Sequence, residues 1–165
     1  MCLLRCLPTC RRQSCSICPK AAAVSSTFAG NITFSHVLNL SSVVGGTVNF
    51  TGALDDGGAL SLGLNIVGGG TIVLSGSNLY TGVTTVHSGT LALAPGASEQ
   101  GTPIVTVGQN PGDVATVQLG SSSYLGLAGW NAGNPAASTD QPVMIAQNAG
   151  STGTIYFNAS PVGGI

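Results

Sequence analysis

Five cysteines near the start of the chain are the first residues whose spacing suggests chemistry. They follow the pattern C-x3-C-x3-C-x4-C-x2-C, and Cys15 with Cys18 has the form of half a zinc site or of a redox motif. Zinc needs a second pair of ligands, but the two histidines, His36 and His87, lie far along the sequence. A disulfide framework leaves one of the five thiols over, and the redox motif lacks a strand-to-helix context. We therefore expect no metal, redox centre or other cofactor.

The segment that holds these cysteines differs from the rest of the chain. All four basic residues lie in residues 1–20, and residues 21–165 carry only five acids. A twin-arginine export signal is not supported, because no apolar stretch of about 7–15 residues follows Arg11 and Arg12. We expect residues 1–20 to be a disordered leader, or an upstream stretch read as coding, outside the fold. Residues 21–165 then form one domain of ordinary size.

The acids and histidines of that domain are candidates for acid–base chemistry. Asp55 and Asp56 are adjacent, which suits a carboxylate pair or a calcium ligand, but two glycines follow them and favour a solvated turn. With Val86 facing inward in the predicted strand 84–90, His87 faces outward, and His36 has no acid nearby in the sequence. No nucleophile elbow, phosphate loop or metalloprotease motif occurs. We assign no catalytic, cofactor-binding or metal-binding residue and predict that the protein is not an enzyme.

Aromatic residues and asparagines offer two further functional interpretations. Tyr124 and Trp130 lie near the predicted loop 129–135, where exposed rings can stack on sugars, although a Trp beside a long turn more often seals a core. Three triplets match the glycosylation pattern, at Asn31, Asn49 and Asn158. About two such matches are expected by chance in this composition, so the triplets decide nothing.

Composition excludes several classes of protein. Only 5% of the residues are charged against about a quarter in ordinary domains, 43% are hydrophobic, and 25 are glycines. Disordered chains are poor in apolar residues, which argues against disorder of the whole chain. The net charge of −1 and the lack of a basic stripe argue against nucleic-acid binding. The sequence contains no stretch of about 18 apolar residues, so it predicts no membrane-spanning helix.

Short alternating segments predict the elements that position these residues. Five times a small residue is followed by threonine, an apolar residue, any residue and a second apolar residue, at 46–50, 70–74, 89–93, 115–119 and 153–157. Residues two apart share one face of a strand, so both apolar residues of each copy point the same way. The threonines lie 24, 19, 26 and 38 residues apart, which is typical of stacked supersecondary units.

A longer internal copy indicates how these strands are arranged. The segment 105–119 recurs 38 positions later at 143–157 as strand, glycine turn and strand in the same order. We predict an all-β fold, a right-handed parallel β-helix of the pectin-lyase-like solenoid type, and a fragment of a longer one. Stacking like residues in register explains the low charge, because identical charges on adjacent strands repel. An antiparallel sandwich is the rival architecture, because short strands with glycine-rich turns suit it as well.

Residues 68–96 carry a resemblance to a known family. Their sequence, GGGTIVLSGSNLYTGVTTVHSGTLALAPG, closely resembles the autotransporter-associated β-strand repeat of bacterial passenger domains and large surface proteins. The resemblance covers one repeat, with looser echoes over 37–60 and 103–157. It implies a right-handed β-helix displayed on a Gram-negative cell surface, and an outer-membrane translocation barrel elsewhere in such proteins. The chain itself shows neither a signal peptide nor the roughly ten-residue strands of a membrane barrel.

Three functions are compatible with these features. The first is a structural passenger or stalk segment of an autotransporter or surface-displayed repeat protein, whose partners are further β-helical repeats of the same polypeptide. The second is an adhesin that binds host or environmental glycans. The third is a polysaccharide-cleaving β-helix enzyme, which the fold permits but which needs charged groups gathered on one face. We expect the first, at the cell surface, in the outer membrane or secreted.

Overall fold

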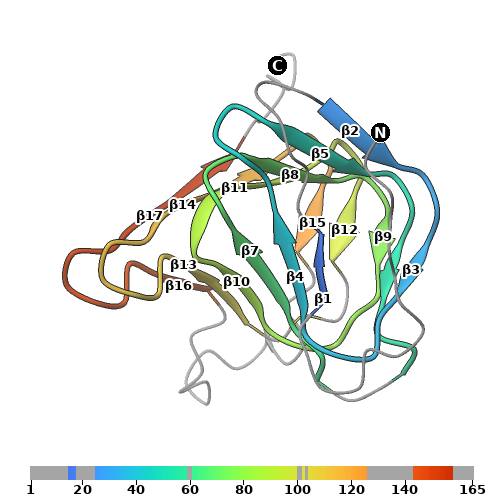
Figure 1. Ribbon diagram of the computed structural model, residues 1–165, viewed down its shortest axis with the longest axis horizontal. Coiled ribbons are helices and arrows are strands. Elements are labelled where there is room, and N and C mark those ends of the chain that lie inside the picture. Colours follow the sequence, from blue (N-terminus) through green and yellow to red (C-terminus); the bar gives the residue numbers. More distant parts are fainter. Residues whose placement is uncertain are drawn as a thin grey trace, which may run out of the picture.

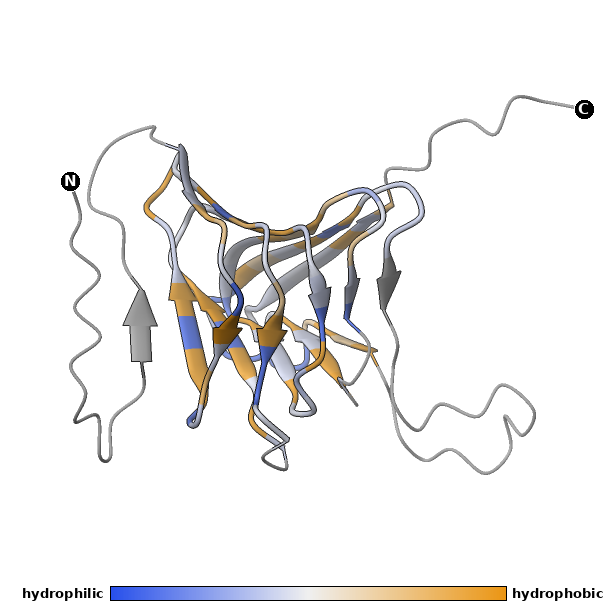
Figure 2. Cartoon of the chain, turned by 90° about the vertical axis from the view of Figure 1, so that its right-hand side faces the viewer, coloured by the Kyte–Doolittle hydropathy of each residue, from blue (hydrophilic) through white to orange (hydrophobic). Residues whose placement is uncertain are grey.

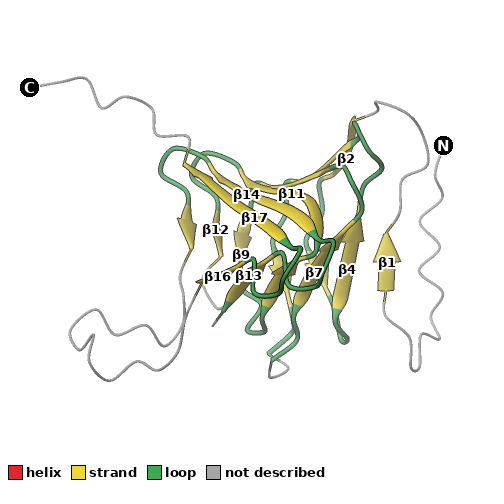
Figure 3. Cartoon of the chain, turned by 90° about the vertical axis from the view of Figure 1, so that its left-hand side faces the viewer, coloured by secondary structure: helices red, strands yellow, loops and turns green. Residues whose placement is uncertain are grey.

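The computed structural model describes residues 15–17, 25–58, 61–99, 102, 104–125 and 143–157, which form strands and loops without a helix (Figure 3). The strands are β1 (Cys15–Ile17), β2 (Ser25–Phe28), β3 (Ile32–Thr33), β4 (Leu38–Ser41), β5 (Thr47–Phe50), β6 (Leu54–Asp55), β7 (Leu64–Val67), β8 (Thr71–Leu74), β9 (Ser77–Asn78), β10 (Thr84–Val86), β11 (Ser88–Leu93), β12 (Ser98–Glu99), β13 (Val105–Val107), β14 (Val114–Leu119), β15 (Tyr124–Leu125), β16 (Val143–Ile145) and β17 (Thr152–Phe157).

The strands stack in parallel into sheets that surround a common interior (Figure 1). Sheet A has the order β1-β4-β7-β10-β13-β16, and sheet B has the order β2-β5-β8-β11-β14-β17. Two smaller sheets, β3-β6 and β9-β12-β15, lie between them along the chain. The chain thus visits sheet B, a small sheet and sheet A in turn, and we call each such group of three strands a repeat. All pairs between described strands are parallel, so the antiparallel sandwich is excluded for these residues.

The register of sheet B confirms the periodicity that the threonines predict. Thr71 pairs with Thr47 on one side and with Thr90 on the other, and Thr116 pairs with Thr90 and Thr154. Each of the five predicted strands therefore lies beside the next copy of its own pattern. The unequal spacings of 24, 19, 26 and 38 residues leave the register intact, because insertions fall in the loops.

The internal copy of 38 residues is also in register. Val105 pairs with Val143 in sheet A, and Val117 pairs with Ile155 in sheet B. The glycine turns between these strands stack too, since the Gly112 N–H donates to the Gly150 carbonyl at 3.1 Å. The two turns extend from the sheets as neighbouring loops, yellow and red in Figure 1.

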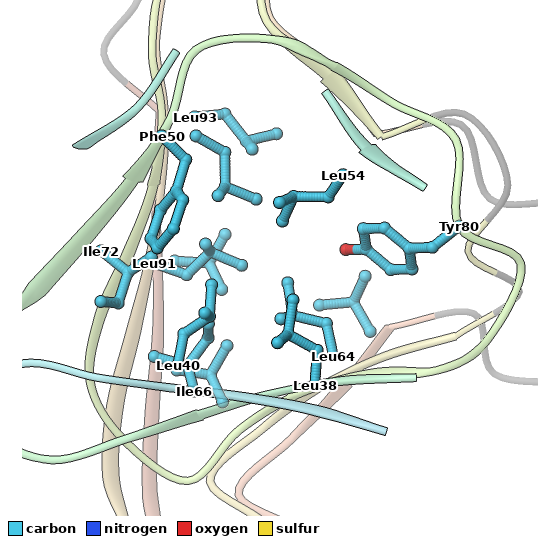
Figure 4. Packing of buried hydrophobic residues seen from close by; sticks show 14 of the residues in the cluster. Leu38, Leu40, Phe50, Leu54, Leu64, Ile66, Ile72, Tyr80, Leu91 and Leu93 are labelled. Carbon is cyan, nitrogen blue, oxygen red and sulfur yellow. The ribbon is translucent and has the colours of Figure 1, made fainter. Parts of the chain in front are cut away.

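Alternation in the strands creates the core. In β8 the side chains of Ile72 and Leu74 are buried while those of Thr71 and Val73 are only partly covered. The buried side chains of several repeats meet in one cluster (Figure 4), and the apolar segments follow the strands (Figure 2). The inward orientation predicted from the sequence holds from β5 to β14. Phe157 of β17 also occupies a core register position, but its side chain is 68% exposed. The reason is that β14 is the only described strand that pairs with β17, so no described strand covers the other side.

Glycine permits the close stacking of the corners. Gly76 follows β8, and a Cβ atom at this position would lie 2.5 Å from the carbonyl oxygen of Gly52 in the preceding repeat. Any larger residue would push the two repeats apart. The glycine-rich composition is therefore partly a packing requirement, and only some glycines serve turns with positive φ, such as Gly57 and Gly58.

The segment 1–20, expected to lie outside the fold, contributes strand β1. Residues 15–17 pair in parallel with β4, with Cys15 opposite Leu38. The boundary at residue 20 therefore does not coincide with the first strand of sheet A. The rest of that segment lies outside the described residues.

Candidate functional site

Four polar side chains from two neighbouring repeats lie buried together. They are Tyr80 in the connection from β9 to β10, Thr84 in β10, Glu99 in β12 and Thr102 in the connection from β12 to β13. The Tyr80 hydroxyl donates to Glu99 Oε1 at 2.8 Å and is 2.7 Å from Thr84 Oγ1. Thr84 Oγ1 is 3.2 Å from Thr102 Oγ1, and the Thr102 hydroxyl is 2.9 Å from the Gly82 carbonyl oxygen, which accepts. All four side chains are at most 1% exposed. We call Tyr80, Thr84, Glu99 and Thr102 the buried acid cluster.

Burial dominates the electrostatics of this cluster. It raises the pKa of Glu99 from 4.5 to about 7, although the hydrogen bond from Tyr80 favours the ionised form and limits the rise. Burial also raises the pKa of Tyr80 well above 10, and the neighbouring Glu99 adds to that rise. Within the described part of the chain, Glu99 Oε2 has no hydrogen-bond partner. Near neutral pH the cluster therefore holds an acid close to its point of half-ionisation.

Local alternation explains how these residues reach the interior. Asn78 and Tyr80 point inward while Leu79 between them is 46% exposed. In the next repeat Ala97 and Glu99 are buried in the same alternating way, with Glu99 opposite Asn78. Sequence analysis did not single out Glu99 or Tyr80. The available signal was the position of Glu99 two residues after the inward Ala97, opposite Asn78 in the register of β9 and β12.

Asp56 is a second buried acid, and its surroundings differ from those of Glu99. Its Oδ2 accepts from the Thr81 N–H at 2.9 Å and from the Thr81 hydroxyl at 2.6 Å, and its Oδ1 accepts from the Gly58 N–H at 3.2 Å. Burial opposes ionisation, but these hydrogen bonds outweigh it and lower the pKa of Asp56. The expectation of a solvated turn is wrong for Asp56, which is 3% exposed because Thr81 of the next repeat covers it. Asp55 is half-buried and accepts from the Gly57 N–H.

His87 lies at the corner where β10 ends and β11 begins, so the single strand predicted over 84–90 is two strands in different sheets. Its Nδ1 is 3.1 Å from Asp113 Oδ2 and 3.1 Å from Asn110 Nδ2. Asp113 also accepts from the N–H groups of Gln109 and Asn110. Burial opposes the ionisation of Asp113, but these bonds and the contact with His87 outweigh it and lower the pKa of Asp113. The His87 side chain is 25% exposed, so it is a partly covered corner residue and not the open surface histidine that was expected.

The remaining candidates are separated from these groups or fall outside the described residues. His36 is exposed, as expected, and its Nδ1 lies 3.1 Å from the Ser35 hydroxyl. Trp130 and the loop 129–135, proposed as a sugar-stacking site, lie outside the described residues, as do most of the cysteines. Among the residues that are described, no three His, Cys, Asp or Glu side chains converge to hold a metal ion.

These arrangements join successive repeats. Asp56 contacts Thr81, Tyr80 contacts Glu99, and His87 contacts Asp113, and each pair connects one repeat with the next. Asn78 does the same, since its Oδ1 accepts from the Leu54 N–H and its Nδ2 donates to the Ser98 carbonyl. The hydroxyls beside Glu99 are buried, so in this state a substrate has no access to them.

No family model matches the chain, and no curated protein or solved structure matches it. The resemblance of residues 68–96 therefore rests on those residues alone. Within the described ranges, no helix is long and apolar enough to cross a bilayer.

Proposed function

We propose that the chain is a structural passenger or stalk segment of a bacterial autotransporter or another surface-displayed repeat protein, without catalytic activity. The observation that carries this proposal is the use of reactive side chains as links between repeats, with Asp56, Glu99 and Asp113 each bonded to a neighbouring repeat. A stalk needs repeats that stay stacked on one another, and these contacts join each repeat to the next.

The stacked sheets support a right-handed parallel β-helix of the pectin-lyase-like kind, in which each repeat is one coil. Its partners are further coils of the same polypeptide. Two exposed residues in core register favour such partners, because Ile145 of β16 is 47% exposed and Phe157 of β17 is 68% exposed. A following coil would cover both side chains and continue both large sheets.

The proposed location is the cell surface or outer membrane of a Gram-negative bacterium, or the secreted fraction. It rests on the resemblance of residues 68–96, which also suggests a translocation barrel as an associated domain. The lack of Lys and Arg in residues 21–165 gives trypsin no cleavage site there, so a broad-specificity protease is the suitable probe.

Protease accessibility on intact cells tests this location. In cells that carry the native gene, proteinase K added outside should shorten the protein while a cytoplasmic marker stays intact. Protein that is protected in intact cells and cleaved only after lysis would contradict surface display. Incubation of the purified chain with a panel of polysaccharides, including polyuronates, tests the absence of catalysis, and any turnover that tracks with the purified chain would favour the enzymatic alternative.

A glycan-binding adhesin is the second candidate, favoured by one feature of sheet B. Its outward face carries threonines in register on five consecutive strands. They are Thr47, Thr71, Thr90, Thr116 and Thr154. This column presents hydroxyl groups at the spacing of the strands, about 4.8 Å, without any charge. A glycan array distinguishes the two candidates. A stalk should give the same signal as a variant in which the exposed Thr154 is replaced by Ala, whereas an adhesin should give a higher signal than that variant.

A further inference from the structure

Glu99 links two repeats through Tyr80, and it is also a buried acid whose titration plays no part in the proposed stalk function. Its side chain is 1% exposed in β12, and it lies in register with Asn78 of β9 and Leu125 of β15. One carboxyl oxygen accepts a hydrogen bond from Tyr80, and the other has no partner among the residues that the structure describes. Figure 4 shows the Tyr80 hydroxyl pointing into the apolar cluster, away from solvent.

The groups that surround Glu99 are neutral. The hydroxyls of Tyr80, Thr84 and Thr102 form a connected chain that ends on backbone carbonyls, such as that of Gly82. Each hydroxyl provides one proton, and the chain supplies only one of these protons, from Tyr80, to the carboxyl group. An ionised carboxylate therefore has one donor where solvent would provide several.

Among the described residues, no opposite charge balances Glu99 from the neighbouring elements. The titratable group that faces it is Tyr80, between β9 and β10; β9 offers Asn78, and β10 offers Thr84. Residues 21–165 contain no Lys or Arg, and the two histidines lie elsewhere, His36 before β4 and His87 at the corner after β10. The other buried acid, Asp56, is bonded to Thr81 and Gly58. A negative charge on Glu99 is thus buried without compensation from the part of the chain that the structure describes, which is strongly unfavourable.

We propose that Glu99 is a pH-sensitive element of the fold, neutral in the folded protein under mildly acidic conditions and ionised inside the core as the pH rises, so that the stacking of β12 on β9 weakens. The sign follows from the pKa, which folding raises from 4.5 to about 7. A group with a raised folded pKa contributes stability below its unfolded value and loses that contribution as the pH rises through its folded value. The window of loss is therefore from about pH 4.5 to about pH 7. The inference does not depend on the stalk function.

Equilibrium unfolding of the full chain between pH 5 and pH 8 tests the proposal. For the wild type relative to E99Q, the folded-to-unfolded ratio should fall about 70-fold between these limits. E99Q keeps the side-chain size and both histidines, so the difference between the two proteins isolates the ionisation of Glu99. Y80F removes the Tyr80 hydroxyl that donates to Glu99 and keeps the aromatic ring, so the midpoint of the loss should move to higher pH. A purely structural role of Tyr80 would leave that midpoint unchanged.

Infrared spectroscopy of the wild type at pH 5.5 provides a second measurement that does not require the variants to fold. Hydrogen bonds lower the pKa of Asp56 and of Asp113, so these two acids do not supply the signal. A protonated carboxyl band that disappears as the pH rises towards 8 therefore reports Glu99. Equal pH dependence of wild type and E99Q, or the absence of a protonated carboxyl band at pH 5.5, would overturn the proposal.

Discussion

Asp56 illustrates how the same residue type acquires a different role from its neighbour when one side chain of the next repeat covers it. Asp55 bonds only to the N–H of Gly57 within its own turn, whereas Asp56 receives two bonds from Thr81, 25 residues further along the chain. The covering residue belongs to the next repeat, so the local sequence of the turn does not reveal the burial of Asp56. At the residue scale, contacts between repeats therefore decide which acids matter.

Replacing Asp56 by Ala should destabilise the protein by about 1–3 kcal/mol, because it removes the acceptor from three buried or partly buried donors. The matched control is Asp55→Ala, at the adjacent half-buried position, which should cost only about 0.5 kcal/mol because Asp55 accepts a single bond, from Gly57 in its own turn. Urea unfolding of the two variants provides the comparison. Equal costs for the two substitutions would show that the contact with Thr81 adds no stability.

Asp56 and Asp113 also predict loss of stability in acid. Hydrogen bonds lower the pKa of both carboxyl groups below 3.8, so their contribution is complete well above that value and is lost as the pH falls through the folded pKa. The direction is opposite to that of Glu99. Thermal unfolding from pH 5 to pH 2 should show a falling midpoint temperature, and Asp56→Asn should reduce the slope because the amide does not titrate. A variant with an unchanged slope would contradict the assignment to Asp56.

At the scale of elements, the strands were predictable because their signal is local. Alternation in segments such as 70–74 fixes which face is buried, and the recurrence of the same pattern fixes the parallel register. The corners were less predictable. The segment 84–90 has the alternation of one strand, but the chain leaves sheet A at His87 and enters sheet B. At this corner Gly89 lies so close to the preceding repeat that a Cβ atom would be 2.5 Å from the carbonyl oxygens of Gly68 and Gly70.

The candidate site was less predictable than the strands for the same reason. Asp55, Asp56 and His87 were recognised as chemically capable residues, but their partners, such as Thr81 and Asp113, lie about one repeat away. Glu99 was missed because an acid beside a turn normally lies in solvent. Knowledge of the register would have placed it opposite Asn78, in an inward position.

Two residues of one column test the packing of the elements. Leu74 and Phe157 occupy the same register position in sheet B, in β8 and β17, but Leu74 is fully buried and Phe157 is 68% exposed. Leu74→Ala should cost about 2–5 kcal/mol, because it leaves a cavity among packed side chains. Phe157→Ala should stay within about 0.5 kcal/mol. Chemical denaturation measures both values, and a large cost for Phe157→Ala would show that this side chain is covered in solution.

At the scale of the whole molecule, stacking in one dimension predicts a gradient of stability along the chain. In sheet B, β11 pairs with both β8 and β14, whereas β2 and β17 each pair with one described strand. Opening a repeat at either end disrupts one interface between repeats, and opening a middle repeat disrupts two. Native-state hydrogen exchange at low denaturant should therefore find the slowest backbone amides in β8 and β11 and faster ones in β2 and β17.

Leu74→Ala should accelerate exchange in β8 and its neighbours β5 and β11 more than in β17, because each repeat contacts only adjacent repeats. Equal exchange rates in all strands, with an equal response to the substitution, would instead mean that the sheets open as one cooperative unit.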